Sequence, residues 1–429
     1  MSLAFYEVES YRGFAEPVRV EFRPLTLVFG YNSAGKSALL RALSLMAEST
    51  RPRSVGPLAL DAAAIRGATF DELTSRYTQE PFIRLSLGFA DASLKRASFK
   101  IRDVPERRRQ IIETLTIEHG NREHDAEVRW KPSAANLKDS SVYELVYQGR
   151  SYPLSLGFQG LVPQGIDESA DTPPPVVECL QHLSNELDNL PQSVYWLGPQ
   201  RVLPSRSREY RARPVRVRPD GADAEDILAY DYLDGGTLVA DISAWYQQAT
   251  RYRLEVRQEG AGTSGRFALM LSPLGASPVQ VHIKDTGEGS IQVLPVLVLA
   301  AMARHGRLPR HSVLALEHPE LHLHPAAHQH LAEFLCRVSQ ADSQPRLLVE
   351  THSENFLLRV QLEIVEGRLP AEHAQIYWIR QAEDGRAAVE HITFNNMGEP
   401  RGAWPPGLFS EDIEQARQII QARRQRRTA

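Results

Sequence analysis

The sequence has very little cysteine and no long apolar run. Cys179 and Cys336 are its two cysteines, so it carries neither a disulfide framework nor a CxxC metal or redox pair. No segment approaches the roughly 20 apolar residues that cross a bilayer. The start, MSLAFYEVES, lacks the basic and apolar regions of a signal peptide. We therefore expect a cytoplasmic protein in a reducing environment, without a membrane partner.

Lysine is also scarce, and neither sign of charge dominates. Arginine supplies most of the positive charge, which is typical of a compositional bias of the source genome; the lysines are Lys36, Lys95, Lys100, Lys131, Lys138 and Lys284. The net charge of −4 excludes a uniformly basic nucleic-acid-binding surface, so any such contact must be local. The hydrophobic content of 42% and the length of 429 residues predict a globular protein with two or three domain-sized units.

A phosphate-binding loop is the clearest motif present. Residues 30–37, GYNSAGKS, match G-x-x-x-x-G-K-[ST], between an apolar strand-like run (25–29) and a segment with helical periodicity (36–48). Backbone N–H groups of such a loop cradle phosphates, the lysine reaches the β- and γ-phosphates, and the serine holds Mg²⁺. The alternative, a plain glycine turn, explains the context less well. The expected ATP-binding residues are Gly30, Tyr31, Asn32, Ser33, Ala34, Gly35, Lys36, Ser37 and Ala38.

The rest of the chain divides into segments of different pattern. Two short strands precede the loop, and five strand-like runs between residues 81 and 148 predict an antiparallel-rich first lobe over 1–160. Residues 161–284 are expected to be an inserted or connecting region, with a helix at 176–190, an Arg-rich loop and a helix plus three strands from about 226. From 285 to 410 helices alternate with apolar strands, which indicates a parallel α/β lobe. A basic helix is expected at 411–429.

Two apolar strands of the last lobe end in polar residues. SVLAL (312–316) runs into Glu317 and is followed by HPELHLHP, while RLLVETHS (346–353) ends in Thr351, His352 and Ser353. A buried strand ending in a carboxylate is the Walker B arrangement, which places negative charge near Mg²⁺. Upstream, the Gly/Ser turn at Gly289 and Ser290 opens a further helix-like segment.

With these motifs in this order, the chain resembles the ABC-type ATPase heads of the RecF/SMC/OLD superfamily. It is most similar to small bacterial AAA-family ATPases with an ExPExxLHP motif, which occur in DNA repair and anti-phage defence. The similarity covers residues 4 to about 410; it is carried by SYRGF…GYNSAGKS, YWLGPQR, GSIQVLP, EHPELHLHP, VETHS and NNMGEPRGAWPPGLF. It implies an α/β fold of the P-loop NTPase, ABC-ATPase type, with an antiparallel-rich first lobe, a mostly parallel second lobe and inserted segments.

The resemblance also implies a composite ATP site. Glu317 occupies the Walker B position and, with Ser37, would hold Mg²⁺ through ATP. Gly289 and Ser290 match the signature motif, which contacts the γ-phosphate from an opposite protomer. His352 is the expected switch histidine, His324 and Pro325 fall in the D-loop, and Arg12 is a weaker nucleotide contact; the sequence leaves Gln79, Gln159 and Gln200 open as the glutamine that completes the Mg²⁺ site.

One position departs from the family pattern. The catalytic glutamate normally follows Walker B directly, but His318 stands there, and Glu320 is the nearest substitute. We therefore expect catalytic roles for Glu317, His318, Glu320 and His352, with slow turnover. A zinc site built from histidines is a weaker interpretation, because their spacing does not settle on one helix face. The histidines concerned are His318, His322, His324, His328 and His330.

The Arg-rich segment 201–218 has two interpretations. It carries seven arginines around Tyr210, and such a set could contact DNA or an acidic partner, or form a solvated loop. Arg201 could instead point toward the nucleotide. The C-terminal QARRQRR is equally ambiguous.

The sequence thus predicts an ATP-binding protein that dimerises or assembles further around ATP and controls a separate effector, such as a nuclease or toxin. A Toprim nuclease of the OLD type is not found after the head, so we expect the effector to be a partner protein. The first alternative is a regulatory module that binds ATP without hydrolysing it and sequesters its partner. The second, a transporter ATPase subunit, is disfavoured because the sequence has no LSGGQ-like string.

Overall fold

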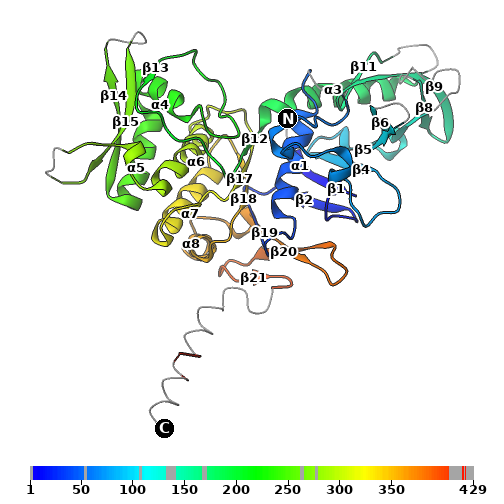
Figure 1. Cartoon of the computed structure of the whole chain (residues 1–429). Coiled ribbons are helices and arrows are strands. Elements are labelled where there is room, and N and C mark those ends of the chain that lie inside the picture. The colour runs from blue at the N-terminus through cyan, green and yellow to red at the C-terminus, as the bar shows by residue number, and fades with distance from the viewer. Residues whose placement is uncertain are drawn as a thin grey trace.

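The computed structural model describes residues 3–52, 56–105, 109–131, 142–166, 172–260, 265–275, 279–404, 418, 419 and 421. The predicted C-terminal helix at 411–429 and its basic end therefore lie almost wholly outside the described residues. Within them, no helix is long and apolar enough to cross a membrane. Figure 1 shows a body in which two outer groups of strands flank a central layer of strands and helices.

The first sheet is antiparallel throughout, and it confirms the strand-rich first lobe. Its order is β2-β1-β4-β5-β6-β7-β8-β9. β1 and β2, the two short strands expected before the loop, pair antiparallel. The strands are β1 (Leu3–Glu9), β2 (Val18–Glu21), β4 (Ile83–Phe89), β5 (Leu94–Val104), β6 (Arg109–His119), β7 (Ala126–Trp130), β8 (Val142–Tyr147) and β9 (Arg150–Ser155).

The second sheet is mostly parallel and contains the strand before the phosphate-binding loop. Its order is β12-β17-β18-β3-β19-β20-β21, and the first five strands run parallel. β3 thus lies among strands from the C-terminal part of the chain, although the sequence division assigned it to 1–160. The strands are β3 (Leu25–Gly30), β12 (Val194–Leu197), β17 (Val313–Glu317), β18 (Arg346–Glu350), β19 (Ala374–Gln381), β20 (Ala387–Phe394) and β21 (Pro400–Arg401).

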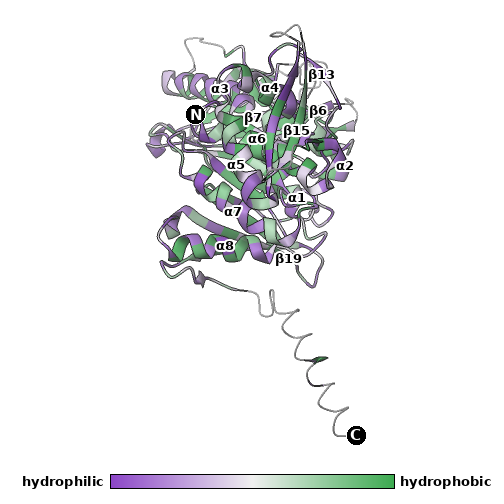
Figure 2. Cartoon of the chain, turned by 90° about the vertical axis from the view of Figure 1, so that its left-hand side faces the viewer, coloured by the Kyte–Doolittle hydropathy of each residue, from purple (hydrophilic) through white to green (hydrophobic). Residues whose placement is uncertain are grey.

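Alternate residues of β3 face two different apolar cores. Val28 belongs to the core shared with the antiparallel sheet and α1 (Lys36–Glu48), whereas Leu27 and Phe29 belong to the core of the C-terminal helices. All six residues of β3 are buried, as a parallel strand covered on both faces requires. The helices of the second core are α6 (Glu288–Arg304), α7 (Pro325–Ser339) and α8 (Glu354–Val365). Figure 2 shows α6 within the body and α8 near its edge.

A smaller sheet packs at the outer end of the second core. It joins β13 (Arg208–Glu209), β14 (Tyr252–Glu259), β15 (Arg266–Pro273) and β16 (Val281–His282), with α5 (Thr237–Thr250) against β14. The expected helix and three strands are therefore present. α4 (Ala224–Leu233) was not predicted. The structure buries Glu225 and Asp226 beside Arg208.

The remaining elements are short, apart from the helix predicted at 176–190. That helix is α3 (Pro174–Ser193), which contacts β5 and leads directly into β12. The short ones are η1 (Ala63–Ile65), α2 (Phe70–Leu73), η3 (Arg122–His124), β10 (Gly157–Gln159), β11 (Val162–Gln164), η5 (Ile283–Asp285) and η6 (Ala371–His373).

Candidate functional site

The loop between β3 and α1 has a backbone that only glycine permits at two positions. Gly30 has φ +147°, and a Cβ there would lie 1.9 Å from the carbonyl oxygen of Ile379 on the neighbouring strand β19. Gly35 has φ +113° and directly precedes the first turn of α1. The left-handed conformations turn the loop around the helix N-terminus, where free backbone N–H groups and the helix dipole favour an anion.

Lys36 is held inside this loop. Its Nζ donates to the carbonyl oxygens of Gly30, at 2.9 Å, and Tyr31, at 2.7 Å. Burial lowers the pKa of the ammonium, while Glu350 opposes that shift. Lys36 thus lies within the loop and also lines the pocket that the loop borders.

That pocket, with a volume of about 440 Å³, brings together five distant parts of the chain. Among the residues expected at the nucleotide site, those that line it are Arg12, Asn32, Ser33, Ala34, Gly35, Lys36, Ser37, Ala38, His318 and His352. Sequence reasoning did not single out six others, which are Gly13, Arg41, Glu350, Gln381, Gly385 and Ala387. The cradle of backbone N–H groups, Lys36 and the Ser37 hydroxyl fits the phosphates and metal of Mg²⁺–ATP.

Glu317 does not line the pocket. Its side chain is fully buried, and Arg41 donates to both of its oxygens, from Nε at 2.7 Å and from Nη2 at 2.5 Å. The indole Nε1 of Trp196 donates to Oε1 as well, at 2.8 Å. The carboxylate expected to face the metal is therefore enclosed by three hydrogen bonds from other side chains.

Glu350 is the carboxylate that does line the pocket. The Ser37 hydroxyl donates to its Oε1 at 2.8 Å, and the Nε2 atom of His318 lies 3.4 Å from the same oxygen. Burial, and then the charge of Glu317, raises the pKa of Glu350 to about 7. Glu350 ends β18 opposite Glu317 on β17. Glu350 could have been predicted from the sequence, because it is an acid at the end of an apolar strand, the same pattern that singled out Glu317.

His318 and His352 stack face to face beside the phosphate loop. Their ring centroids are 5.2 Å apart and the planes differ by 11°. Burial, followed by the charge of Lys36, lowers the pKa of His352 to about 4, and burial also lowers the pKa of His318. Both rings are therefore neutral near pH 7. His318 has φ +44°, a conformation that turns the chain sharply after β17.

Glu320 supports the turn that carries His352. Its Oε1 accepts hydrogen bonds from the Thr351 hydroxyl, at 2.6 Å, and from the His352 backbone N–H, at 3.1 Å. The residue is buried and does not line the pocket. In this structure Glu320 positions His352, and its predicted catalytic role stays a prediction.

Gly289 and Ser290 lie in the first turn of α6, away from the residues that line the pocket. A Cβ on Gly289 would come within 2.4 Å of the carbonyl oxygen of His322, so the glycine lets the 322–323 backbone approach. Their predicted contact with a nucleotide held by a second copy is not made within one chain, and it stays a prediction.

Most arginines of the segment 201–218 have partners inside the protein. Arg201 is buried and donates to the carbonyl oxygens of Gln292, Glu317 and His318. Five others bind carboxylates or carbonyls: Arg206 to Asp285, Arg208 to Glu225 and Asp226, Arg213 to Asp234, Arg216 to Pro191 and Val194, and Arg218 to Asp223. Contact with nucleic acid through this segment would have to displace these bonds.

Two of the histidines after β17, His324 and His328, have hydrogen-bonding partners within the fold. His328 contacts the Ser353 hydroxyl and the Leu323 carbonyl, and His324 caps the N-terminus of α7 through its Nδ1. Across the described ranges, no group of three or more His, Cys, Asp or Glu is arranged to hold a metal ion. Of the glutamines, Gln381 lines the pocket, whereas Gln79, Gln159 and Gln200 do not.

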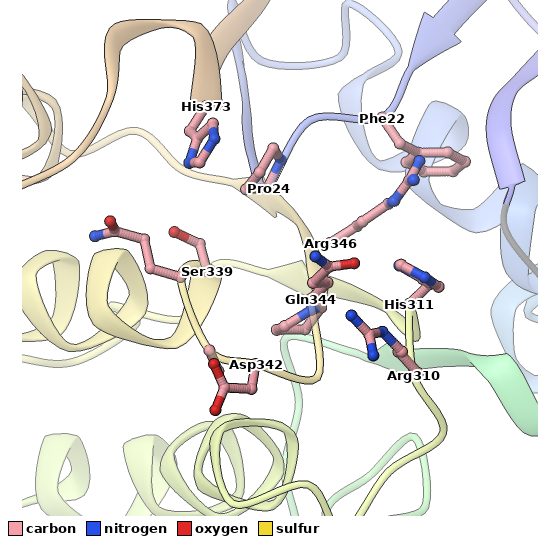
Figure 3. A pocket seen from close by; sticks show the side chains of 12 residues that line it. Phe22, Pro24, Arg310, His311, Ser339, Asp342, Gln344, Arg346 and His373 are labelled. Atoms are coloured by element: carbon pink, nitrogen blue, oxygen red, sulfur yellow. The ribbon is translucent and has the colours of Figure 1, made fainter. Parts of the chain in front are cut away.

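A second and larger pocket lies at the opposite ends of the parallel strands. Its volume is about 630 Å³, and it is lined by residues at or just before the starts of β3, β17, β18 and β19, including Pro24, His311, Arg346 and His373 (Figure 3). Ligands of open α/β sheets bind at the carboxyl ends of the strands. The smaller pocket, beside the phosphate loop, is therefore the candidate functional site.

Comparison with known proteins finds similarity in one segment of the sequence and in the fold. Residues 278–359 match the family model described as "AAA domain, putative AbiEii toxin, Type IV TA system". A solved SMC head bound to the C-terminal winged-helix domain of ScpA matches with a TM-score of 0.52 and 12% identity, over 92% of this chain and 98% of that one. A Pyrococcus furiosus SMC head matches over 99% of both chains at 11% identity, with a TM-score of 0.49. Comparison with curated proteins finds no match.

The fold and the match of one segment to a family model indicate the class of ATPase that the chain resembles. The chain has the α/β fold of a P-loop ATPase head of the SMC type, which confirms the fold predicted from its motifs. This fold, together with the match of residues 278–359 to an AAA-domain model, supports an ATPase similar to the heads of the RecF/SMC/ABC-type superfamily.

Proposed function

We propose that the protein binds Mg²⁺–ATP in the pocket beside the phosphate loop and works as an ATP-gated switch. The observation that carries the proposal is the convergence of residues 12, 32–38, 318 and 352, four separate segments, on one pocket at the carboxyl ends of parallel strands. Lys36, Arg12 and Arg41 supply positive charge, and Ser37 supplies a hydroxyl ligand for the metal. Bound Mg²⁺ would neutralise phosphate charge during transfer.

We further propose that hydrolysis is slow. In the family pattern a glutamate at position 318 orients the attacking water, and here a histidine stands there. His318 packs on His352 and is neutral near pH 7, so it supplies no carboxylate for that task. Two copies would close around ATP when Ser290 of each reaches the nucleotide of the other, and hydrolysis would reopen them.

The dimer would control a separate effector, such as a nuclease or toxin, in DNA repair or anti-phage defence. The similar SMC head was solved with a domain of ScpA, which is a precedent for an ATPase head that carries a partner protein. The neutral His318–His352 pair also favours the second candidate function, a module that binds ATP without hydrolysing it and sequesters its effector. A transporter subunit remains a remote alternative.

The proposal is tested by ATP binding and turnover. Wild-type protein should bind ATP in a calorimetric titration, and Lys36→Ala should lose at least about 2 kcal/mol of binding free energy because a charge-assisted contact is removed. The wild-type protein should hydrolyse fewer than about 1 ATP per second, which is below the usual range of enzyme turnover. Turnover of tens per second that His318→Ala leaves unchanged would contradict the slow switch, and absence of ATP binding would contradict the proposal as a whole.

A further inference from the structure

The two strand-end carboxylates beside the phosphate loop differ in what surrounds them. Glu317 accepts three hydrogen bonds, two from Arg41 and one from Trp196, and its side chain is fully buried. The guanidinium of Arg41 forms an ion pair with Glu317 and neutralises the charge of this carboxylate. A metal ion could reach Glu317 only after this arrangement had been broken, which would leave the partly buried Arg41 without its carboxylate partner.

Glu350, unlike Glu317, has a carboxylate oxygen that is available to bind a cation. Oε1 of Glu350 faces the Ser37 hydroxyl, and Oε2, although buried, has no hydrogen-bond partner among the described residues. The side chain is only 2% exposed, yet it lines the pocket. A buried, unpartnered carboxylate oxygen is costly, and a bound cation would offset that cost.

The sheet order places Glu350 nearer the phosphate loop than Glu317. β18 lies directly beside β3, where Glu350 pairs with Val28, whereas β17 is one strand further away. The serine that would hold the metal thus already contacts the β18 carboxylate. Carboxylate and hydroxyl oxygens are the hard ligands that Mg²⁺ prefers.

We propose that Glu350, rather than Glu317, supplies the protein carboxylate for the Mg²⁺ that accompanies ATP, together with Ser37. Glu317 is then a positioning residue, whose buried charge holds Arg41 at the edge of the pocket. This inference rests on the proposed ATP binding. The carboxylate that faces the metal would then stand at the end of β18, two residues before His352, and not at the end of the Walker B strand β17.

A matched pair of variants tests the assignment. ATP affinity is measured for wild type, Glu350→Gln and Glu317→Gln, each with Mg²⁺ and with EDTA, and Mn²⁺ binding in the presence of ATP is followed by electron paramagnetic resonance. For E350Q we expect the Mg²⁺-dependent gain in affinity to fall at least about tenfold, with the affinity in EDTA nearly unchanged. E317Q should keep the gain and lose thermal stability. The opposite pattern would overturn the assignment.

If E350Q folds poorly, a variant with an altered metal preference tests the same assignment. A thiolate prefers soft metals, so Glu350→Cys should lose the Mg²⁺-dependent gain and recover it with Cd²⁺, while Glu317→Cys should not show this recovery. Folded E350C that responds to Mg²⁺ like wild type would refute the proposal. Wild-type protein that binds no ATP under either condition would refute the proposed function itself, so the two failures are distinguishable.

Discussion

At the scale of single residues, Trp196 is the neutral partner that completes the shell around Glu317. Its Nε1 donates to Oε1 at 2.8 Å, from the end of β12. Trp196→Phe keeps most of the ring and removes this bond, so it should cost about 1.5–3 kcal/mol of unfolding free energy, the range for a hydrogen bond to a charged group. Urea unfolding measures the loss.

Trp245→Phe is the matched control for this change. Trp245 is also buried, but its Nε1 has no hydrogen-bond partner within the described residues. Its replacement removes a similar volume and no such bond. An equal or smaller loss for W196F than for W245F would show that the contact with Glu317 contributes nothing to stability.

Gly289 gives a second prediction at this scale. Gly289→Ala would place a methyl group 2.4 Å from the His322 carbonyl oxygen and force the 322–323 turn away from α6. We expect a loss of about 1–3 kcal/mol, as in other overpacked sites. Gly287→Ala, two residues earlier, meets no atom within 4 Å and has φ −64°, so it should leave the unfolding midpoint almost unchanged. Similar midpoints for both variants would contradict the close packing.

At the scale of elements, Arg201 joins the end of β17 to α6. It is buried, it donates to three carbonyls on the two elements, and burial lowers its pKa to about 10. Arg201→Met would leave these carbonyls without their donor and should cost about 3 kcal/mol or more. Exposed Arg211→Met is the control. Thermal unfolding compares them, and equal midpoints would contradict the structural role.

The short helix η5 provides a pH-dependent prediction. The Nδ1 atom of its capping residue, His282, accepts a hydrogen bond from the Lys284 N–H at 3.0 Å, and burial lowers the His282 pKa. As pH falls through about 6.5, His282 is protonated in the unfolded chain but not yet in the folded protein. Protonation therefore favours the unfolded chain, and the free energy of unfolding decreases.

His282→Asn keeps an acceptor for the cap and removes the titration. The unfolding free energy of wild type should therefore fall more than that of H282N between pH 7.5 and 5.5. Parallel curves for the two proteins would show that His282 titrates as it does in the unfolded chain.

The elements show how much of this fold the sequence could predict. Strands β3, β17 and β18 and helix α1 were predictable because apolar runs end at glycines or acids. α4 was not, since its buried acids Glu225 and Asp226 pair with Arg208, 17 and 18 residues earlier, and hydrophobic periodicity does not reveal such pairing. For the same reason the site prediction chose Glu317: which of two strand-end acids faces Ser37 depends on sheet order, which local pattern does not encode.

At the scale of the whole molecule, one chain provides one half of the proposed composite site. The phosphate loop lies at the end of β3, whereas Gly289 and Ser290 begin α6 and do not line its pocket. A second copy would have to supply the signature side. ATP would then join the two copies, and its loss would separate them, which is how a small ligand could control an effector held by the pair.

The most direct measurement is the mass of the assembly at equilibrium, with and without Mg²⁺–ATP, for wild type, Lys36→Ala and Ser290→Arg. Wild type should become about twice as massive, or more, when ATP is added. K36A should not change because it does not hold the nucleotide, and S290R should bind ATP yet keep its mass because the second half of the site is blocked. A wild-type mass that ATP leaves unchanged, in a protein shown to bind ATP, would contradict the central claim.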